Sequence, residues 1–121
     1  MEPDILIGVV SNLFSKQMHF QSAGDVMQGH RHLHDHMTLL AYGRLRVTVD
    51  EQATEFAAPH MIYIRAGKAH HLEALEDHTV AYCIHPLRDK DGSGDILDPS
   101  MIPNNGLDPS LIDAEPLVQR T

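Results

Sequence analysis

The sequence predicts an all-β domain, and three observations support this. Apolar and polar residues alternate with a period of two in several short segments, most clearly at 44–50, where Leu45, Val47 and Val49 alternate with polar residues. Segment 79–85 is rich in residues that favour strands. No window of a dozen residues shows a convincing 3.6-residue period. Many short strands with regular turns are typical of an antiparallel sandwich or barrel.

The expected strands follow one another over residues 5–87. The apolar run 5–10 predicts an N-terminal strand, and the alternation over 14–20 predicts the next. Residues 36–42 precede Gly43 and lead into 44–50, so we expect 36–50 to form a hairpin around Gly43. Further strands are expected at 53–57, 60–65, 70–75 and 79–85.

The length and composition predict one domain followed by an irregular tail. The chain has 121 residues, of which 42% are apolar, which suits a single modest core. We expect a barrel over 1–87 and a tail over 88–121, because Asp, Pro, Gly, Ser and Asn dominate 89–110. The apolar side chains of this tail either dock on the barrel or on a partner subunit, or the tail is disordered. These are Ile96, Leu97, Ile102, Leu111 and Ile112.

The net charge indicates which classes of partner are not expected, and the cysteine content indicates the redox state of the compartment. The formal net charge is −8, and no cluster of Lys and Arg is present, so nucleic acid and anionic membranes are not expected partners. Cys83 is the single cysteine, so no disulfide forms within the chain, which fits a reducing cytoplasm. The acidic N-terminus and the six-residue apolar run do not resemble a signal peptide or a membrane span.

Four histidines form the first candidate for a divalent-metal site. His30 and His32 point to one face of an extended segment, because side chains alternate along a strand. His36 begins the next expected strand, where its parity places Thr38, Leu40 and Tyr42 on its face. His70 follows a turn and begins a distant strand, from which Leu72 and Ala74 should also face inward. Imidazole is the commonest neutral metal ligand. One alternative interpretation is that these are surface or core histidines without a metal. Another is that His36 makes a hydrogen bond nearby, which leaves three histidine ligands and open positions on the metal.

At these residues the sequence resembles the cupin family. The first cupin motif is matched at every spacing, with His in place of Glu, by Gly24-(5)-His30-Arg31-His32-(3)-His36-(6)-Gly43. The second motif keeps its spacing but loses three of its residues in Pro59-(5)-Arg65-Ala66-Gly67-(2)-His70-(3)-Ala74. Together the motifs span 24–74. The resemblance implies a small single cupin β-barrel, a double-stranded β-helix or jelly roll, with one divalent metal and often a dimeric assembly.

The substitution of His36 for the motif's Glu bears on the metal. Four neutral imidazoles at His30, His32, His36 and His70 would leave the ion its full +2 charge and strengthen its Lewis acidity. Imidazole ligands suit Fe, Zn, Cu and Ni, whereas oxygen-rich sites favour Mn. Fe(II) is the first choice, because iron cupins with all-histidine ligands carry out dioxygen chemistry, which is an implication of the resemblance.

The sequence therefore predicts a metal-dependent enzyme, most plausibly an Fe(II) oxygenase that acts on a small organic substrate. Tyr42, Tyr82 and His85 are the candidate catalytic groups, because hydroxyl and imidazole groups near the metal could handle protons. Two alternatives stay open. One is a non-catalytic cupin that binds a metal or ligand, and the other is a lyase or isomerase that uses the metal as a Lewis acid.

The strand expected at 36–42 also indicates a partner. Met37, Leu39 and Ala41 would face away from the metal and are apolar. In a small barrel such an outer face usually meets another subunit or the chain's own N-terminal strand, which here could be residues 5–10, swapped across a dimer. We therefore expect a homodimer.

Overall fold

The computed structural model describes residues 1–10, 12–28, 36–65, 67–86 and 118–120, and these form strands and turns with no helix. The described residues accordingly include no helix that could cross a membrane. The all-β prediction is confirmed. The strands are β1 (Asp4–Val10), β2 (Leu13–Phe20), β3 (Val26–Met27), β4 (His36–Tyr42), β5 (Arg44–Val49), β6 (Gln52–Ala57), β7 (His60–Ile64), β8 (His70–Ala74), β9 (Thr79–Pro86) and β10 (Val118–Arg120).

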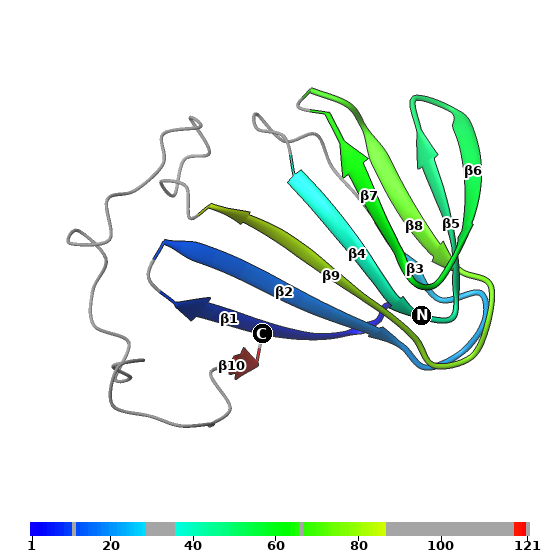
Figure 1. Cartoon of the computed structure of the whole chain (residues 1–121). Helices are drawn as coiled ribbons and strands as arrows, with labels where there is room; N and C mark the ends of the chain where they lie inside the picture. Colours follow the sequence, from blue (N-terminus) through cyan, green and yellow to red (C-terminus); the bar gives the residue numbers. More distant parts are fainter. Residues whose placement is uncertain (11, 29–35, 66, 87–117, 121) are drawn as a thin grey trace.

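The strands build two sheets that face each other (Figure 1). Sheet A has the order β10-β1-β2-β9-β4-β7, and sheet B has the order β3-β8-β5-β6. All of the strand pairs are antiparallel. Strands β7 and β6 are the last strands of their sheets, so the barrel has an unpaired seam between them.

The period-two alternation of the sequence places the core between the sheets. On β5, Leu45 and Val47 are buried, and on β8, Leu72 and Ala74 are buried. Sheet A contributes the inward residues of its long strands, for example Leu40, which is 1% exposed. Because successive side chains point to opposite faces, the residues between these face solvent. The inward parity predicted for Leu72 and Ala74 is therefore confirmed.

The hairpin predicted over 36–50 is wrong. β4 pairs with β7 and β9, and β5 pairs with β6 and β8, so Gly43 turns the chain from sheet A into sheet B. Gly43 has a φ of 87°, and a Cβ added there would lie 2.9 Å from Thr79 Cα. A glycine at a sharp reversal indicates the turn, but it does not say whether the chain stays in the same sheet.

The connections between the sheets differ at the two ends of the barrel. At one end, the closed end, the chain crosses between sheets four times, at 21–25, Gly43, 58–59 and 75–78. At the other end it crosses twice, between β3 and β4 and between β7 and β8. Since β4 and β8 begin there, at His36 and His70, we call it the histidine end.

The predicted tail lies almost wholly outside the described residues, including its five apolar side chains. At its end, β10 pairs with β1 in antiparallel register, with Leu6 opposite Arg120. β1 also pairs with β2 of its own chain along its whole length, from Asp4 opposite His19 to Val10 opposite Leu13. The N-terminal strand therefore extends sheet A sideways and does not cover the outer face of β4.

Candidate metal centre and adjoining pocket

His70 lies where the sequence motif predicts an inward-facing ligand. It begins β8 opposite Val49 of β5, is half-buried, and has the same parity as the buried Leu72 and Ala74. Its Nδ1 lies 3.3 Å from the Lys68 carbonyl oxygen. Because a carbonyl can only accept, Nδ1 carries the proton in this hydrogen bond. A backbone carbonyl that orients an imidazole in this way is common behind metal-binding histidines.

The other three predicted ligands belong to the chain that arrives at the same end. The backbone of His36 begins β4 opposite Ile64 of β7, and its side chain lies outside the described residues. His30 and His32 lie in 29–35, which also falls outside them. This segment follows Gln28, directly after Met27 pairs with Leu72 of β8, and ends where β4 begins. Both of its attachment points are therefore at the histidine end. In the part of the chain that is described, no three His, Cys, Asp or Glu side chains form a metal-binding group.

His85 is the one predicted catalytic residue that lies toward the histidine end. It follows Ile84, which pairs with Met37 of β4, so it is adjacent in register to the start of that strand. By alternation from the buried Cys83 it belongs to the inner face of β9, and its ring stacks on Phe14 with centroids 4.7 Å apart. Its Nδ1 donates to the Pro86 carbonyl oxygen at 2.6 Å.

Neither predicted catalytic tyrosine lies inside the barrel at the histidine end. Tyr42 is at the closed end and is 62% exposed, because the register of β4 against β9 shifts between Leu40 and Tyr42. The expectation that Tyr42 shares the inward face of Leu40 is therefore wrong. Tyr82 lies on the outer face of β9, where its hydroxyl accepts a hydrogen bond from Gln17 Nε2 at 2.8 Å.

Cys83 is buried in the inner face of sheet A, opposite Thr38. Burial raises the pKa of its thiol above the usual value, and the positive charge of Lys16 opposes this rise only in part. A thiol held protonated is a poor nucleophile, so Cys83 behaves as a core residue.

A pocket of about 480 Å³ opens at the seam between β6 and β7. Its floor consists of core side chains from β5 and β7, among them Val47, Ile62 and Ile64. Gln52, Thr54 and Phe56 of β6 form the facing wall. Ile64 pairs with His36, and Val49, another lining residue, pairs with His70, so the pocket lies beside the starts of β4 and β8. His70 itself lines a second hollow, of about 580 Å³, together with Thr48 and His71.

The rim of this pocket carries three charged residues that the sequence analysis did not single out. Lys68 and Asp50 form an ion pair with 3.0 Å between Nζ and Oδ2, and Arg65 lies beside them. Asp50 and Glu51 make the two-residue turn between β5 and β6, with φ of 48° and 70°. The Asp50 amide donates to the Ala69 carbonyl at 3.1 Å, so this strained turn is tied to the β7–β8 connection.

Comparisons with solved structures show the architecture. The structure of KdgF from Halomonas sp. superposes with a TM-score of 0.61 at 18% identity, over 71% of this chain and 78% of that one. A cupin superfamily protein from Desulfitobacterium hafniense gives 0.60 at 14% identity, over 73% and 82%. An RmlC-like cupin with a double-stranded β-helix fold from Methanocaldococcus jannaschii gives 0.61 at 9% identity, over 72% and 83%.

The chain has the cupin fold. The glycines of its two cupin-like motifs all take left-handed backbone conformations, with φ of 94° at Gly24, 87° at Gly43 and 78° at Gly67. No family model matches the sequence, and no curated protein matches it. The cupin architecture is therefore shared with proteins of very low sequence identity.

Proposed function

We propose that this cupin binds one divalent transition-metal ion at the histidine end and uses it as an enzyme on a small organic substrate. His30, His32, His36 and His70 are the proposed ligands. The observation that carries the proposal is the position of His70, which has inward parity at the barrel end where β4 begins with His36 and where the segment bearing His30 and His32 is attached. A pocket of about 480 Å³ lies beside the starts of these strands. The donor set fits a transition metal, because imidazole nitrogen suits Fe, Zn, Cu and Ni.

Fe(II) remains the first choice, with Zn, Ni, Cu and Mn as alternatives. When bound, the ion would supply Lewis-acid or dioxygen chemistry. We assign further roles to residues of the pocket and of β9. The apolar floor at Val47, Ile62 and Ile64 excludes water from a bound substrate, and the imidazole of His85 lies on the inner face of β9 toward the same end. A reducing cytoplasm stays the proposed compartment, on the basis of the single cysteine.

A pocket beside the proposed ligands favours catalysis over a purely structural metal. A structural site is closed by protein ligands, whereas a catalytic site keeps a position open toward substrate. A Lewis-acid lyase or isomerase would use the same ligands and the same pocket, so it differs from the oxygenase only in the reaction. A non-catalytic binding cupin would keep the pocket without turnover.

We expect protein purified without added metal to contain about one equivalent of transition metal by elemental analysis. His30→Ala and His32→Ala should each lose most of it, because each removes a ligand, and His34→Ala serves as the matched control within the same segment. Unchanged metal content in both ligand variants would overturn the site. Oxygen uptake by the iron form tests the reaction class, and stoichiometric zinc with no open coordination position would overturn the oxygenase.

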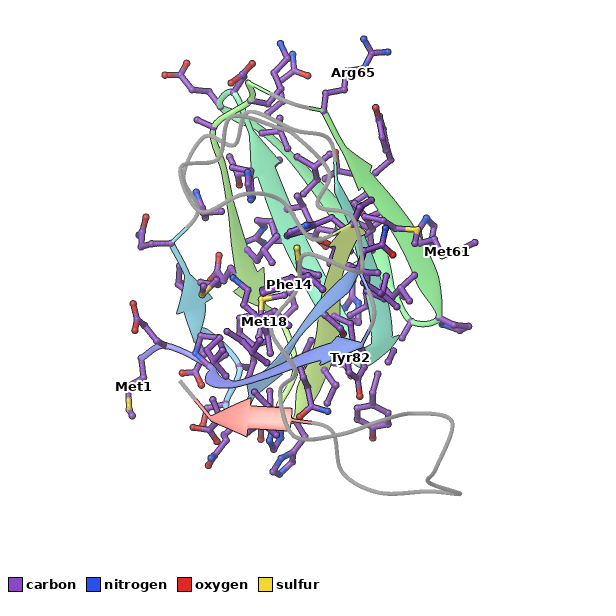
Figure 2. All side chains as sticks on the ribbon, turned by 90° about the vertical axis from the view of Figure 1, so that its left-hand side faces the viewer. Met1, Phe14, Met18, Met61, Arg65 and Tyr82 are labelled. Atoms are coloured by element: carbon purple, nitrogen blue, oxygen red, sulfur yellow. The ribbon has the colours of Figure 1, made fainter. Side chains whose placement is uncertain are left out.

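The proposed partner is a second copy of the chain, docked on the outer face of sheet A. Across β7, β4 and β9 this face presents two continuous apolar rows, which are Tyr63–Met37–Ile84 and Met61–Leu39–Tyr82. Met61 is 71% exposed and points away from the barrel in Figure 2. The outer face of sheet B is polar instead, with Arg46 paired to Glu55 and Glu73. A like face on each of two copies is the usual geometry of a twofold dimer.

We expect the protein to elute as a dimer in size-exclusion chromatography with light scattering, and Met61→Lys to shift it to the monomer. A charge at the centre of a buried apolar face is costly, so a drop in dimer affinity of at least tenfold is expected. Thr48→Lys, on the outer face of sheet B, is the control and should stay dimeric. A monomeric wild type, or equal loss in both variants, would contradict the assignment of this face.

A further inference from the structure

The rim of the seam pocket has an excess of positive charge. Among the described residues that line it are two cations and one acid, and the acid Asp50 is already paired with Lys68. Elsewhere in the described part of the chain, Arg44 and Arg46 are paired with acids on the outer face of sheet B. Arg65 is exposed just beyond the end of β7, at the top of Figure 2, with no acidic group of the described residues paired to it.

The positive charge at the rim is opposite in sign to the net charge of the whole molecule. The chain has a formal net charge of −8, so an anion is repelled by most of its surface. An uncompensated guanidinium at the opening of a cavity reverses that preference at one place. A guanidinium also presents paired N–H donors that match a carboxylate in bidentate geometry.

The lining of the pocket indicates what kind of molecule could carry the anionic group. Val47, Ile62 and Ile64 line it with aliphatic groups, and Phe56 adds an aromatic surface. Thr54 and Gln52 offer hydroxyl and amide groups from β6, so the exposed lining combines polar and apolar groups in about equal measure. A volume of about 480 Å³ suits a small molecule whose body has one apolar side. One net positive charge at the rim balances a monoanion and not a multiply charged one.

We propose that the substrate is a small monocarboxylate, bound with its carboxylate at Arg65 and its apolar body against Val47, Ile62 and Ile64. This inference rests on the proposed function, because it orients the remainder of the molecule toward the histidine end. Arg65 is then the residue that determines specificity for charge, and the Lys68–Asp50 pair keeps the rim in place beside it.

The test uses benzoate and its neutral isostere benzamide as probes, titrated into the full-length protein and followed by amide chemical shifts. Benzoate is expected to bind at least about tenfold more tightly than benzamide, with shifts confined to β5, β6 and β7 around the pocket. Arg65→Gln should remove that difference and leave benzamide binding unchanged. Arg65→Lys should restore part of it, because the charge returns without the bidentate geometry.

Arg44→Gln is the matched control, since it removes the same charge from the outer face of sheet B. Thr54→Trp, on an exposed edge position of the pocket wall, should block both probes. Equal affinity for the two probes, an equal effect of Arg44→Gln, or displacement of benzoate by inorganic phosphate at similar concentration would overturn the inference.

Metal content separates this inference from the proposed function. The titration is carried out on both metal-free and metal-loaded protein, and Arg65→Gln should retain the wild-type metal content. If the wild-type protein binds metal but does not distinguish benzoate from benzamide, the carboxylate site alone is overturned. Probe binding that depends on Arg65, in a protein whose His30→Ala variant keeps its metal, overturns the metal site alone.

Discussion

Replacing His70 with asparagine is expected to abolish the stabilisation that a divalent metal gives the protein, whereas replacing His71 is expected to preserve it. An ion that binds only the folded state stabilises it by about 2.7 kcal/mol when its free concentration is a hundred times Kd, and by about 4.1 kcal/mol at a thousand times. The measurement is thermal unfolding with and without added Zn²⁺ or anaerobic Fe²⁺. The wild type should shift upward, and His70→Asn should not.

His71 is a stringent control because it is the same residue type at the next position. It pairs with Thr48 and lies on the outer face of β8, while His70 lies on the inner face. General histidine affinity for metal ions would make the two variants equivalent. If His71→Asn lost the metal-dependent shift as fully as His70→Asn, or if His70→Asn kept it, the inward site would be contradicted.

Gly43→Ala is expected to destabilise the protein more than any other glycine replacement among the described turns. Left-handed backbone costs a residue with a Cβ about 1–2 kcal/mol. The added Cβ would also meet Thr79, whose Cα lies 2.9 Å away and which is fully buried. Overpacking of this kind costs about 1–3 kcal/mol more. Urea unfolding should therefore show a loss of about 2–5 kcal/mol.

Gly24→Ala is the control that separates the cost of backbone strain from the cost of the contact with Thr79. Gly24 has a φ of 94°, but nothing lies within 4 Å of a Cβ built there. Its replacement should cost only the backbone strain, about 1–2 kcal/mol. Equal losses in the two variants would show that contact with Thr79 contributes nothing. The Thr79 hydroxyl donates to the carbonyls of Arg44 and Glu76, so this residue has little freedom to move away.

Much of the sheet structure could be predicted from the sequence because one face of each strand is buried. The strands expected at 53–57, 60–65, 70–75 and 79–85 match β6 to β9 within one residue at every end. β3 and β10 were not predicted, since two or three residues are too few to show a period. Strand pairing was harder to predict. β4 and β5 are neighbours in sequence but lie in different sheets, and the sequence around Gly43 does not encode their distant partners.

In the candidate site, too, the faces of single strands could be predicted from the sequence, whereas contacts between distant segments could not. Parity alone placed His70 on the inner face of β8, because Leu72 and Ala74 share its alternation. Parity failed at Tyr42, where the register shift after Leu40 interrupts the alternation. The pocket rim was missed altogether. Asp50 and Lys68 come from two different connections, and the pairing of β5 with β8 in sheet B brings Nζ and Oδ2 to 3.0 Å.

The unequal distribution of connections gives the barrel a mechanical asymmetry. Four crossings join the sheets at the closed end and two at the histidine end, and the sheets spread apart toward the latter in Figure 1. Because the sheets are joined more often near Gly43, we expect their separation to vary least there and most where His36 and His70 begin their strands. The width of the seam between β6 and β7 should therefore be least constrained toward the histidine end.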